Sequence, residues 1–166
     1  LKSLIQTYKE RVVNARRDLH RIPEVAYTEK KTSAYVADYL EQEGLTVSTG
    51  IARYGVMGLL ETGRPGPTLL IRADMDALPI QEANDLPYAS QNDGVMHACG
   101  HDAHMTMVLG AAGLLAGNPP EGNVVLVFQP ADERGGGSRV MIEAGALEGV
   151  RAIFGGHVTH EWPTGN

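Results

Sequence analysis

The sequence lacks several features that would place it in a particular class of protein. Its 166 residues include a single cysteine, Cys99, which excludes an internal disulfide and is typical of a reducing compartment, so we expect a cytoplasmic protein. Glycine aside, the longest apolar run is Val124 to Phe128, which is too short to cross a bilayer. The first residues do not resemble a signal peptide, and repeats and low-complexity tracts are missing, so we expect one domain.

Charge is unevenly distributed along the chain. Basic residues gather at the beginning, and lysine does not occur after Lys31. The remainder is acidic, and the net charge is −6. Because an acidic surface repels phosphate groups, we expect neither nucleic acid nor an anionic membrane as a partner. The composition, 43% hydrophobic and 20% charged, is that of a globular domain with a sizeable core.

Helical and strand patterns alternate along the chain. Apolar residues at intervals of three and four predict helices, whereas short β-branched runs predict strands. The predicted helices are one ending before Pro23, one from Thr28 to Gly44 with Thr28 as N-cap, one from His104 to Ala116, and a short one from Met141 to Ala144. The predicted strands are Tyr54 to Glu61, Thr68 to Ala73, Val124 to Phe128 and Ile153 to Val158, the last two buried. This alternation predicts an α/β layer structure with a largely parallel or mixed sheet.

Metal-binding residue types gather where predicted strands end or a helix begins. Ligands of such sheets bind beyond the carboxyl ends of the strands. Cys99 and His101 are two residues apart, so in an extended segment their side chains leave the same face and suit zinc. Asp132 and Glu133 follow a buried strand and would point to opposite sides, one towards a metal and the other towards a water or substrate. His157, at another strand end, adds an imidazole, and the combination is typical of metal-assisted hydrolysis.

Other interpretations of the same residues remain open. Cys99 with a histidine base would also make a nucleophile, although an orienting acid and an oxyanion hole are not identified. Each residue alone is also consistent with a purely structural role, and Asp74 and Asp76 are equally typical of a turn. The glycines at 135–137 are not followed by Lys-Ser/Thr, so a P-loop is excluded.

Four ordered motifs resemble a known family. They are H-x-x-P-E within Asp18 to Glu24, RADMDALP at Arg72 to Pro79, MHACGHDAH at Met96 to His104, and FQPADE at Phe128 to Glu133. Together they are similar to the amidohydrolase branch of peptidase family M20, which includes aminoacylases, hippurate hydrolases and auxin-conjugate hydrolases. The resemblance implies a three-layer zinc-peptidase-like catalytic domain. It also implies two divalent metal ions (zinc, manganese, cobalt or nickel) and hydrolysis of the amide bond of small N-acyl amino acids.

The resemblance also implies roles for individual residues. The implied metal ligands are Cys99, His101, Glu133 and His157. Asp132 falls where the family has its general base, and Asp76 matches the acid that supports a metal ligand. The role of Asp74 stays open. His97 and His104 flank the ligands and fit supporting or substrate-facing roles better than ligation.

Two departures from the family pattern shape the remaining expectations. Asp132 is one methylene shorter than the family's glutamate, so we expect a weak hydrolase or one that acts through an additional water. The family's chains are longer, and they add a lid or dimerisation domain and a last metal-binding histidine. In this chain only His160 could take the place of that histidine. We therefore expect residues 1–166 to be the N-terminal part of the catalytic domain of an enzyme that can form homodimers. The alternative is a catalytically impaired module of the same fold that binds metal or a partner.

Overall fold

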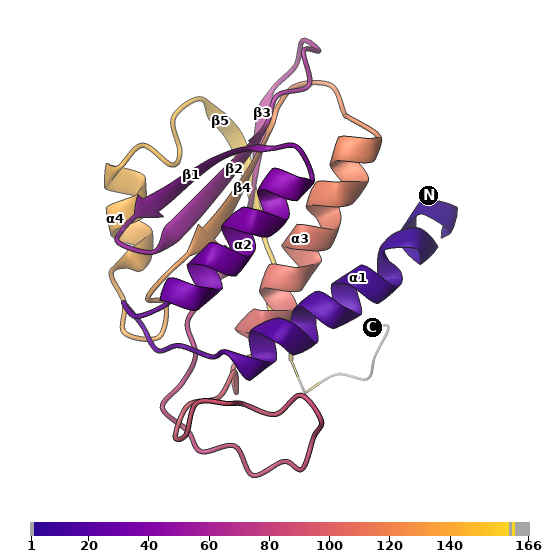
Figure 1. The fold of residues 1–166 in the computed structure, drawn as a ribbon. Coiled ribbons are helices and arrows are strands. Elements are labelled where there is room, and N and C mark those ends of the chain that lie inside the picture. The colour runs from indigo at the N-terminus through magenta and orange to yellow at the C-terminus, as the bar shows by residue number, and fades with distance from the viewer. Residues whose placement is uncertain (1, 160, 162–166) are drawn as a thin grey trace.

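A mixed five-stranded sheet with helices on both faces forms the body of the molecule (Figure 1). The computed structural model describes residues 2–159 and 161. The helices are α1 (Lys2–Arg21), α2 (Lys30–Gln42), α3 (His101–Gly117) and α4 (Gly137–Glu143). The strands are β1 (Thr46–Ile51), β2 (Gly55–Leu60), β3 (Thr68–Asp74), β4 (Val124–Gln129) and β5 (Val150–Gly155), in the sheet order β1-β2-β4-β3-β5. The predicted α/β class is confirmed.

The central strand β4 shows how the sequence builds the three layers. All of its residues are buried, as its continuous apolar run predicts. Successive side chains point to opposite faces, so Leu126 and Phe128 enter the core beneath α1, α2 and α3. Val125 and Val127 enter a smaller core on the other face, together with Met141 of α4. In Figure 1, α2 and α3 cover the near face of the sheet, and α1 packs against α3.

The strand directions bring the predicted site segments to one edge of the sheet. Strands β3 and β4 are parallel, with Asp74 in register with Gln129. Strand β5 is parallel to β3 on its other side, with Gly155 opposite Arg72. The loops that follow β3, β4 and β5 therefore leave the sheet on the same side, at the carboxyl ends of these strands, and α3 also begins there. This side is called the carboxyl edge of the sheet below.

The two edge strands depart from the sequence-based prediction. Strand β1 was not predicted, because its residues are mostly exposed and polar and show no apolar alternation. Strand β5 covers Val150–Gly155 instead of residues 153–158, and the prediction that it is buried is wrong. Ile153 and Phe154 are 61% and 70% exposed, because β5 is the last strand of this sheet and has no further strand beside it among the described residues.

The beginning of α2 also differs from its prediction. Thr28 is not the N-cap, and its hydroxyl donates to the carbonyl of Val25. Instead the carboxylate of Glu24 accepts hydrogen bonds from the backbone N–H groups of Lys31 and Thr32, at 3.1 and 2.9 Å. Two of the N–H groups that a helix start leaves without partners are satisfied in this way. Within the described part of the chain, no helix is long and apolar enough to cross a membrane.

Candidate metal centre

Cys99, His101 and His157 meet at the carboxyl edge of the sheet. Their Sγ and ring nitrogen atoms all lie within 4.8 Å of one another, and Cys99 Sγ is 3.4 Å from His157 Nε2. Cys99 and His101 do not come together through an extended segment, as was predicted. Gly100 adopts φ +88°, and His101 is already the first residue of α3. A Cβ atom on Gly100 would meet Val158 Cγ2 at 2.4 Å, so the glycine also allows the segment that carries His157 to approach.

The imidazole of His101 is oriented with one nitrogen towards this group. Its Nδ1 lies 2.6 Å from the backbone carbonyl of Asp76, so Nδ1 carries the proton and donates it. Its Nε2 is buried and has no hydrogen-bond partner among the described residues. The nearest carboxylate oxygens, of Asp74 and Glu133, are 3.7 and 3.6 Å away. A histidine that donates one N–H to a carbonyl and leaves the other nitrogen without a partner is typical of a metal ligand.

His157 is held by a chain of hydrogen bonds that begins on β3. Its own Nδ1 bonds to the carbonyl of Val158 at 2.6 Å, which turns Nε2 towards Cys99. The N–H of Val158 donates to His104 Nε2 at 2.9 Å, and His104 Nδ1 donates to Asp74 at 2.6 Å. Arg72 binds the second oxygen of Asp74 at 2.6 Å. Both nitrogens of His104 are used, so it supports the site rather than offering an open ligand atom, although it lies within 4.8 Å of Asp74 and His101.

The neighbouring carboxylates of Asp132 and Glu133 have different partners. Glu133 faces His101, whereas Asp132 accepts from Arg72 at 2.5 Å and from the amide of Gln129 at 3.0 Å. The side chain of Asp132 is 41% exposed. Asp76 is fully buried, and its two oxygens accept the backbone N–H groups of Asp132 and Glu133 at 3.0 and 2.9 Å. Asp76 therefore fixes the loop that carries both acids and is not in a position to contact a substrate.

The electrostatics of this group favour a positive charge. Burial raises the pKa of the Cys99 thiol, and the adjacent Glu133 raises it further, to about 12. Burial alone would lower the pKa of His101, but its hydrogen bond to Asp76 and the charge of Asp74 outweigh burial and raise it. A proton on His101 Nε2 would have no acceptor within hydrogen-bond distance among the described residues, whereas one divalent ion could bind the Cys99 thiolate and both imidazoles, and the carboxylate of Glu133 lies 3.6 Å from His101 Nε2. The donor set therefore fits a divalent metal ion, which binds cysteine as the thiolate.

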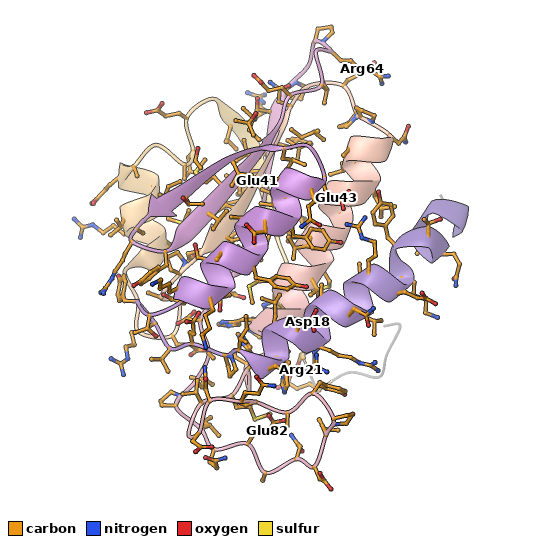
Figure 2. All side chains as sticks on the ribbon, in the orientation of Figure 1. Asp18, Arg21, Glu41, Glu43, Arg64 and Glu82 are labelled. Carbon is orange, nitrogen blue, oxygen red and sulfur yellow. The ribbon has the colours of Figure 1, made fainter. Side chains whose placement is uncertain are left out.

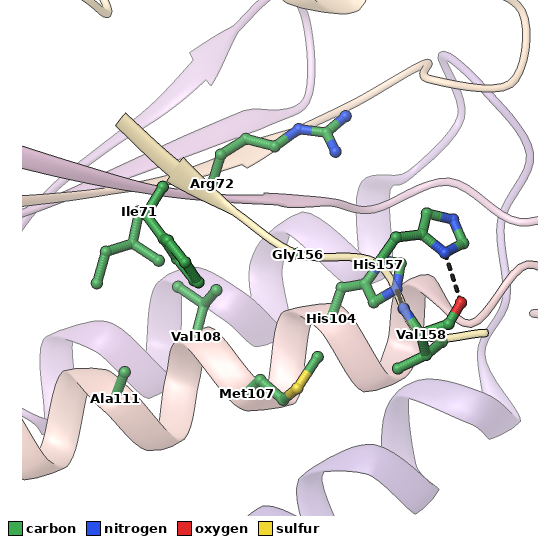
Figure 3. A pocket seen from close by; sticks show the side chains of 10 residues that line it. Ile71, Arg72, His104, Met107, Val108, Ala111, Gly156, His157 and Val158 are labelled. Carbon is green, nitrogen blue, oxygen red and sulfur yellow. Dashed lines mark hydrogen bonds between the residues drawn. The ribbon is translucent and has the colours of Figure 1, made fainter. Parts of the chain in front are cut away.

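An apolar pocket of about 360 Å³ lies beside the ligand group (Figure 3). It opens between α3 and β5, and its wall includes Met107, Val108 and Phe154. His104 and His157 form the end of the pocket nearest the ligands.

The H-x-x-P-E motif has a structural role at the end of α1. His20 Nδ1 bonds to Asp102 at 2.6 Å, and His20 Nε2 lies 3.2 Å from Glu82, in the long loop below α1 in Figure 2. The Asp102 hydrogen bond raises the pKa of His20 despite its burial. His97, in contrast, is buried with both nitrogens lacking a partner among the described residues, and burial lowers its pKa to about 4. His160 lies outside the described residues.

Two side chains that shape this site, Arg72 and Glu29, were not predicted to have a role in it. Arg72 joins Asp74, Gln129 and Asp132, and Glu29 binds the loop before Asp132 from the start of α2. Arg72 stands in a recognised motif, and as a charged residue inside a predicted strand it was a usable signal. Nothing local marks Glu29, because its partner is 102 residues away along the chain.

Fold and site together define an α/β domain with a candidate metal centre at the carboxyl edge of its sheet. The sequence model of peptidase family M20/M25/M40 matches residues 70–166, more than half of the chain. The chain belongs to this family, which confirms the resemblance drawn from the motifs.

Several named proteins are similar to this chain over nearly all of its length. It is 43% identical to thermostable carboxypeptidase 1 of Saccharolobus solfataricus, covering 99% of this chain and 43% of that protein. It is 49% identical to IAA-amino acid hydrolase ILR1-like 4 of Arabidopsis thaliana (93% and 35%), and 43% identical to N-acetylcysteine deacetylase of Bacillus subtilis (96% and 43%). The chain thus spans less than half the length of these relatives.

A solved structure carries the same fold. The YXEP protein of Bacillus subtilis, described as a dinuclear metal-binding peptidase of the M20 family, superposes with a TM-score of 0.91 at 42% identity. The match covers 95% of this chain and 45% of that one.

Proposed function

We propose that this chain provides the metal-binding part of an amidohydrolase that cleaves the amide bond of N-acyl amino acids. The observation that carries the proposal is the buried Nε2 of His101, which has no hydrogen-bond partner in the described structure and faces Cys99, His157 and Glu133. The substrate class is supported by the names of two relatives, an N-acetylcysteine deacetylase and an IAA-amino acid hydrolase. The solved relative described as dinuclear supports two metal ions.

The proposed roles follow from what each side chain contacts. Cys99, His101, Glu133 and His157 would hold the metal, which when bound lowers the pKa of a water molecule and polarises a carbonyl. Asp132 lies next to the ligands and reaches solvent, so we propose it as the group that accepts a proton and passes it to the leaving amine. Asp76 keeps Asp132 and Glu133 in place through their backbone N–H groups.

Metal binding by the chain itself tests the ligand assignment. Cobalt added to the purified chain should give the near-ultraviolet band of a cobalt–thiolate bond, and Cys99→Ser should remove it. Glu133→Gln should weaken binding by at least about tenfold, since changes of even supporting residues cost that much. Glu121→Gln is the matched control, because Glu121 is exposed on a distant loop. Failure of the parent chain to bind cobalt would refute the proposal, and lost turnover in Cys99→Ser with metal retained would favour a cysteine nucleophile.

A second candidate function is a metal-binding module with little or no hydrolytic activity. The observation that favours it is the carboxylate of Asp132, which is short for a general base and is held by Arg72 and Gln129. Asp132→Glu separates the two candidates when it is made in a chain that includes the remaining part of the catalytic domain proposed below. A rise in the turnover of an N-acyl amino acid supports the hydrolase with a weakened base. An unchanged or lower rate contradicts the idea that the missing methylene limits the reaction.

We also propose that residues 1–166 form the N-terminal part of a catalytic domain completed by further chain. Support comes from β5, where Ile153 and Phe154 are largely exposed, and from the length of the relatives. Apolar surface of this kind is normally covered. Joining the C-terminal part of a close relative should protect the β5 amides from hydrogen exchange, and unchanged exchange would argue against this arrangement.

A further inference from the structure

Two buried carboxylates hold the loop that carries the acids of the site. The N–H of Ala131 donates to Glu29 Oε1 at 2.8 Å, and the next two N–H groups donate to Asp76 at 3.0 and 2.9 Å. The side chains of Glu29 and Asp76 are both 0% exposed. Three consecutive peptide groups are therefore fixed by buried acceptor oxygens.

The loop needs such support because its backbone is unfavourable. Ala131 has φ +54°, in the left-handed region that residues other than glycine avoid because of a steric clash of Cβ with the backbone. A residue stays in such a conformation only where its surroundings determine it. Glu29 supplies part of that constraint. It is the residue just before α2 and lies 102 residues from Ala131 along the chain.

The conformation of Ala131 decides where the next two side chains point. Glu133 turns towards His101, with Oε1 3.6 Å from Nε2, whereas Asp132 turns towards Arg72. If Ala131 returned to an ordinary backbone conformation, the following peptide planes would rotate. The carboxylate of Glu133 would then leave the group formed by Cys99, His101 and His157.

We propose that Glu29 is a positioning residue of the metal site, which holds Ala131 in its left-handed conformation and thereby directs Glu133 towards the metal. The inference rests on the proposed function, since it assumes that Glu133 is a ligand. Within the described structure no hydrogen bond joins Glu29 to a proposed ligand side chain, and Glu29 acts through the backbone of residue 131.

A purely structural role for Glu29 predicts a different result, and Glu24 provides the control. Glu24 also acts at the start of α2, where it binds the N–H groups of Lys31 and Thr32, but it does not touch the loop at 131–133. Glu24→Ala should therefore weaken α2 while leaving metal affinity unchanged. Glu29→Ala should weaken metal binding as well.

The experiment compares Glu29→Ala, Glu29→Gln and Glu24→Ala in the full 166-residue chain. Zinc affinity is measured by competition with a chelator, and hydrogen exchange of the Ala131 amide is measured without metal. Glu29→Ala should lower zinc affinity by about tenfold to a hundredfold, the range for residues that support ligands. It should also speed exchange at Ala131. Glu29→Gln retains an acceptor oxygen and should resemble the parent in both measurements.

A rescue variant separates positioning from general stability. Glycine adopts positive φ without the cost that alanine has, so adding Ala131→Gly to Glu29→Ala should recover part of the zinc affinity. If Glu29→Ala does not fold, Glu29→Asp replaces it, because its carboxylate is withdrawn from Ala131 by one methylene.

The outcomes are distinct from those of the proposed function. If the parent binds zinc and Glu29→Ala binds it equally well, the positioning role is overturned while the metal site stands. Equal loss of affinity in Glu24→Ala, or no recovery with Ala131→Gly, also overturns it. A parent chain that binds neither zinc nor cobalt overturns the metal site itself, together with the inference.

Discussion

Asp76→Asn should destabilise the chain although it changes almost no volume. Each oxygen of the Asp76 carboxylate accepts one backbone N–H, from Asp132 and from Glu133. Asparagine keeps one acceptor but places an NH₂ group against the other N–H. Because the side chain is fully buried, that N–H cannot turn to water for a replacement acceptor.

The expected loss follows from these contacts. A hydrogen bond to a charged group contributes about 1.5–3 kcal/mol, and a buried donor without a partner costs about 1–3 kcal/mol. These figures overlap, so we expect a decrease of about 2–4 kcal/mol in the free energy of unfolding. No cavity contributes, since aspartate and asparagine have nearly the same shape. The loss is large beside a total stability of about 5–15 kcal/mol for a natural domain.

Urea denaturation without metal measures this loss directly. The midpoint of Asp76→Asn should fall by about 1–2 M with the slope unchanged. The matched control is Asp93→Asn, since Asp93 is exposed and surface substitutions change stability by less than about 0.5 kcal/mol. If both variants unfold at the same urea concentration as the parent, the Asp76 carboxylate does not hold the loop and the reasoning about this site fails.

Two further predictions concern parts of the fold outside the ligand group. The hydrogen bond to Asp102 raises the pKa of His20, so protonated His20 stabilises the fold below about pH 6.5 and this contribution is lost as the pH rises through its folded-state value. As the pH rises above about 6.5, stability should therefore fall more steeply in the parent than in His20→Gln. Urea midpoints that change equally with pH in both proteins would contradict this. Gly137→Ala should destabilise by about 1–3 kcal/mol, because a Cβ there would lie 1.7 Å from the carbonyl oxygen of Pro130. Gly117→Ala, in a helix with open space around it, should be neutral or stabilising. Thermal melts of both variants beside the parent measure these effects, and an unchanged melting temperature for Gly137→Ala would contradict the predicted clash.

The interior of the fold was predictable because buried elements require apolar residues at regular positions in the sequence. Val124 to Phe128 is apolar at every position, and the structure places it at the centre of the sheet, buried on both faces. The edges were not predictable in this way. Strand β1 is polar because one side of it meets water, and β5 has an apolar sequence but is exposed. An apolar sequence therefore shows that a strand can be buried. Whether another element covers that strand depends on the tertiary fold.

Sheet topology predicts which segments of the candidate site lie close together, but it does not predict the hydrogen bonds of every side chain that supports them. Parallel strands place the ends of β3 and β4 side by side, which brings Asp76 to the loop of Asp132 and Glu133. The hydrogen bonds of His104 and Glu29 depend on side-chain directions that no periodicity records.

The two pairs of neighbouring site residues show why spacing alone is not enough. Cys99 and His101 were expected to meet because alternate residues of a strand share a face, yet they meet because Gly100 turns the chain at the start of α3. Asp132 and Glu133 diverge after a left-handed residue, Ala131, rather than along a strand. A side chain at position 100 would collide with Val158. Gly100 therefore turns the chain between Cys99 and His101 and also leaves room for the segment that carries His157. The geometry of the candidate centre is thus specified by the residues that turn the backbone as much as by the donor atoms, and substitutions there should alter metal affinity without removing any ligand.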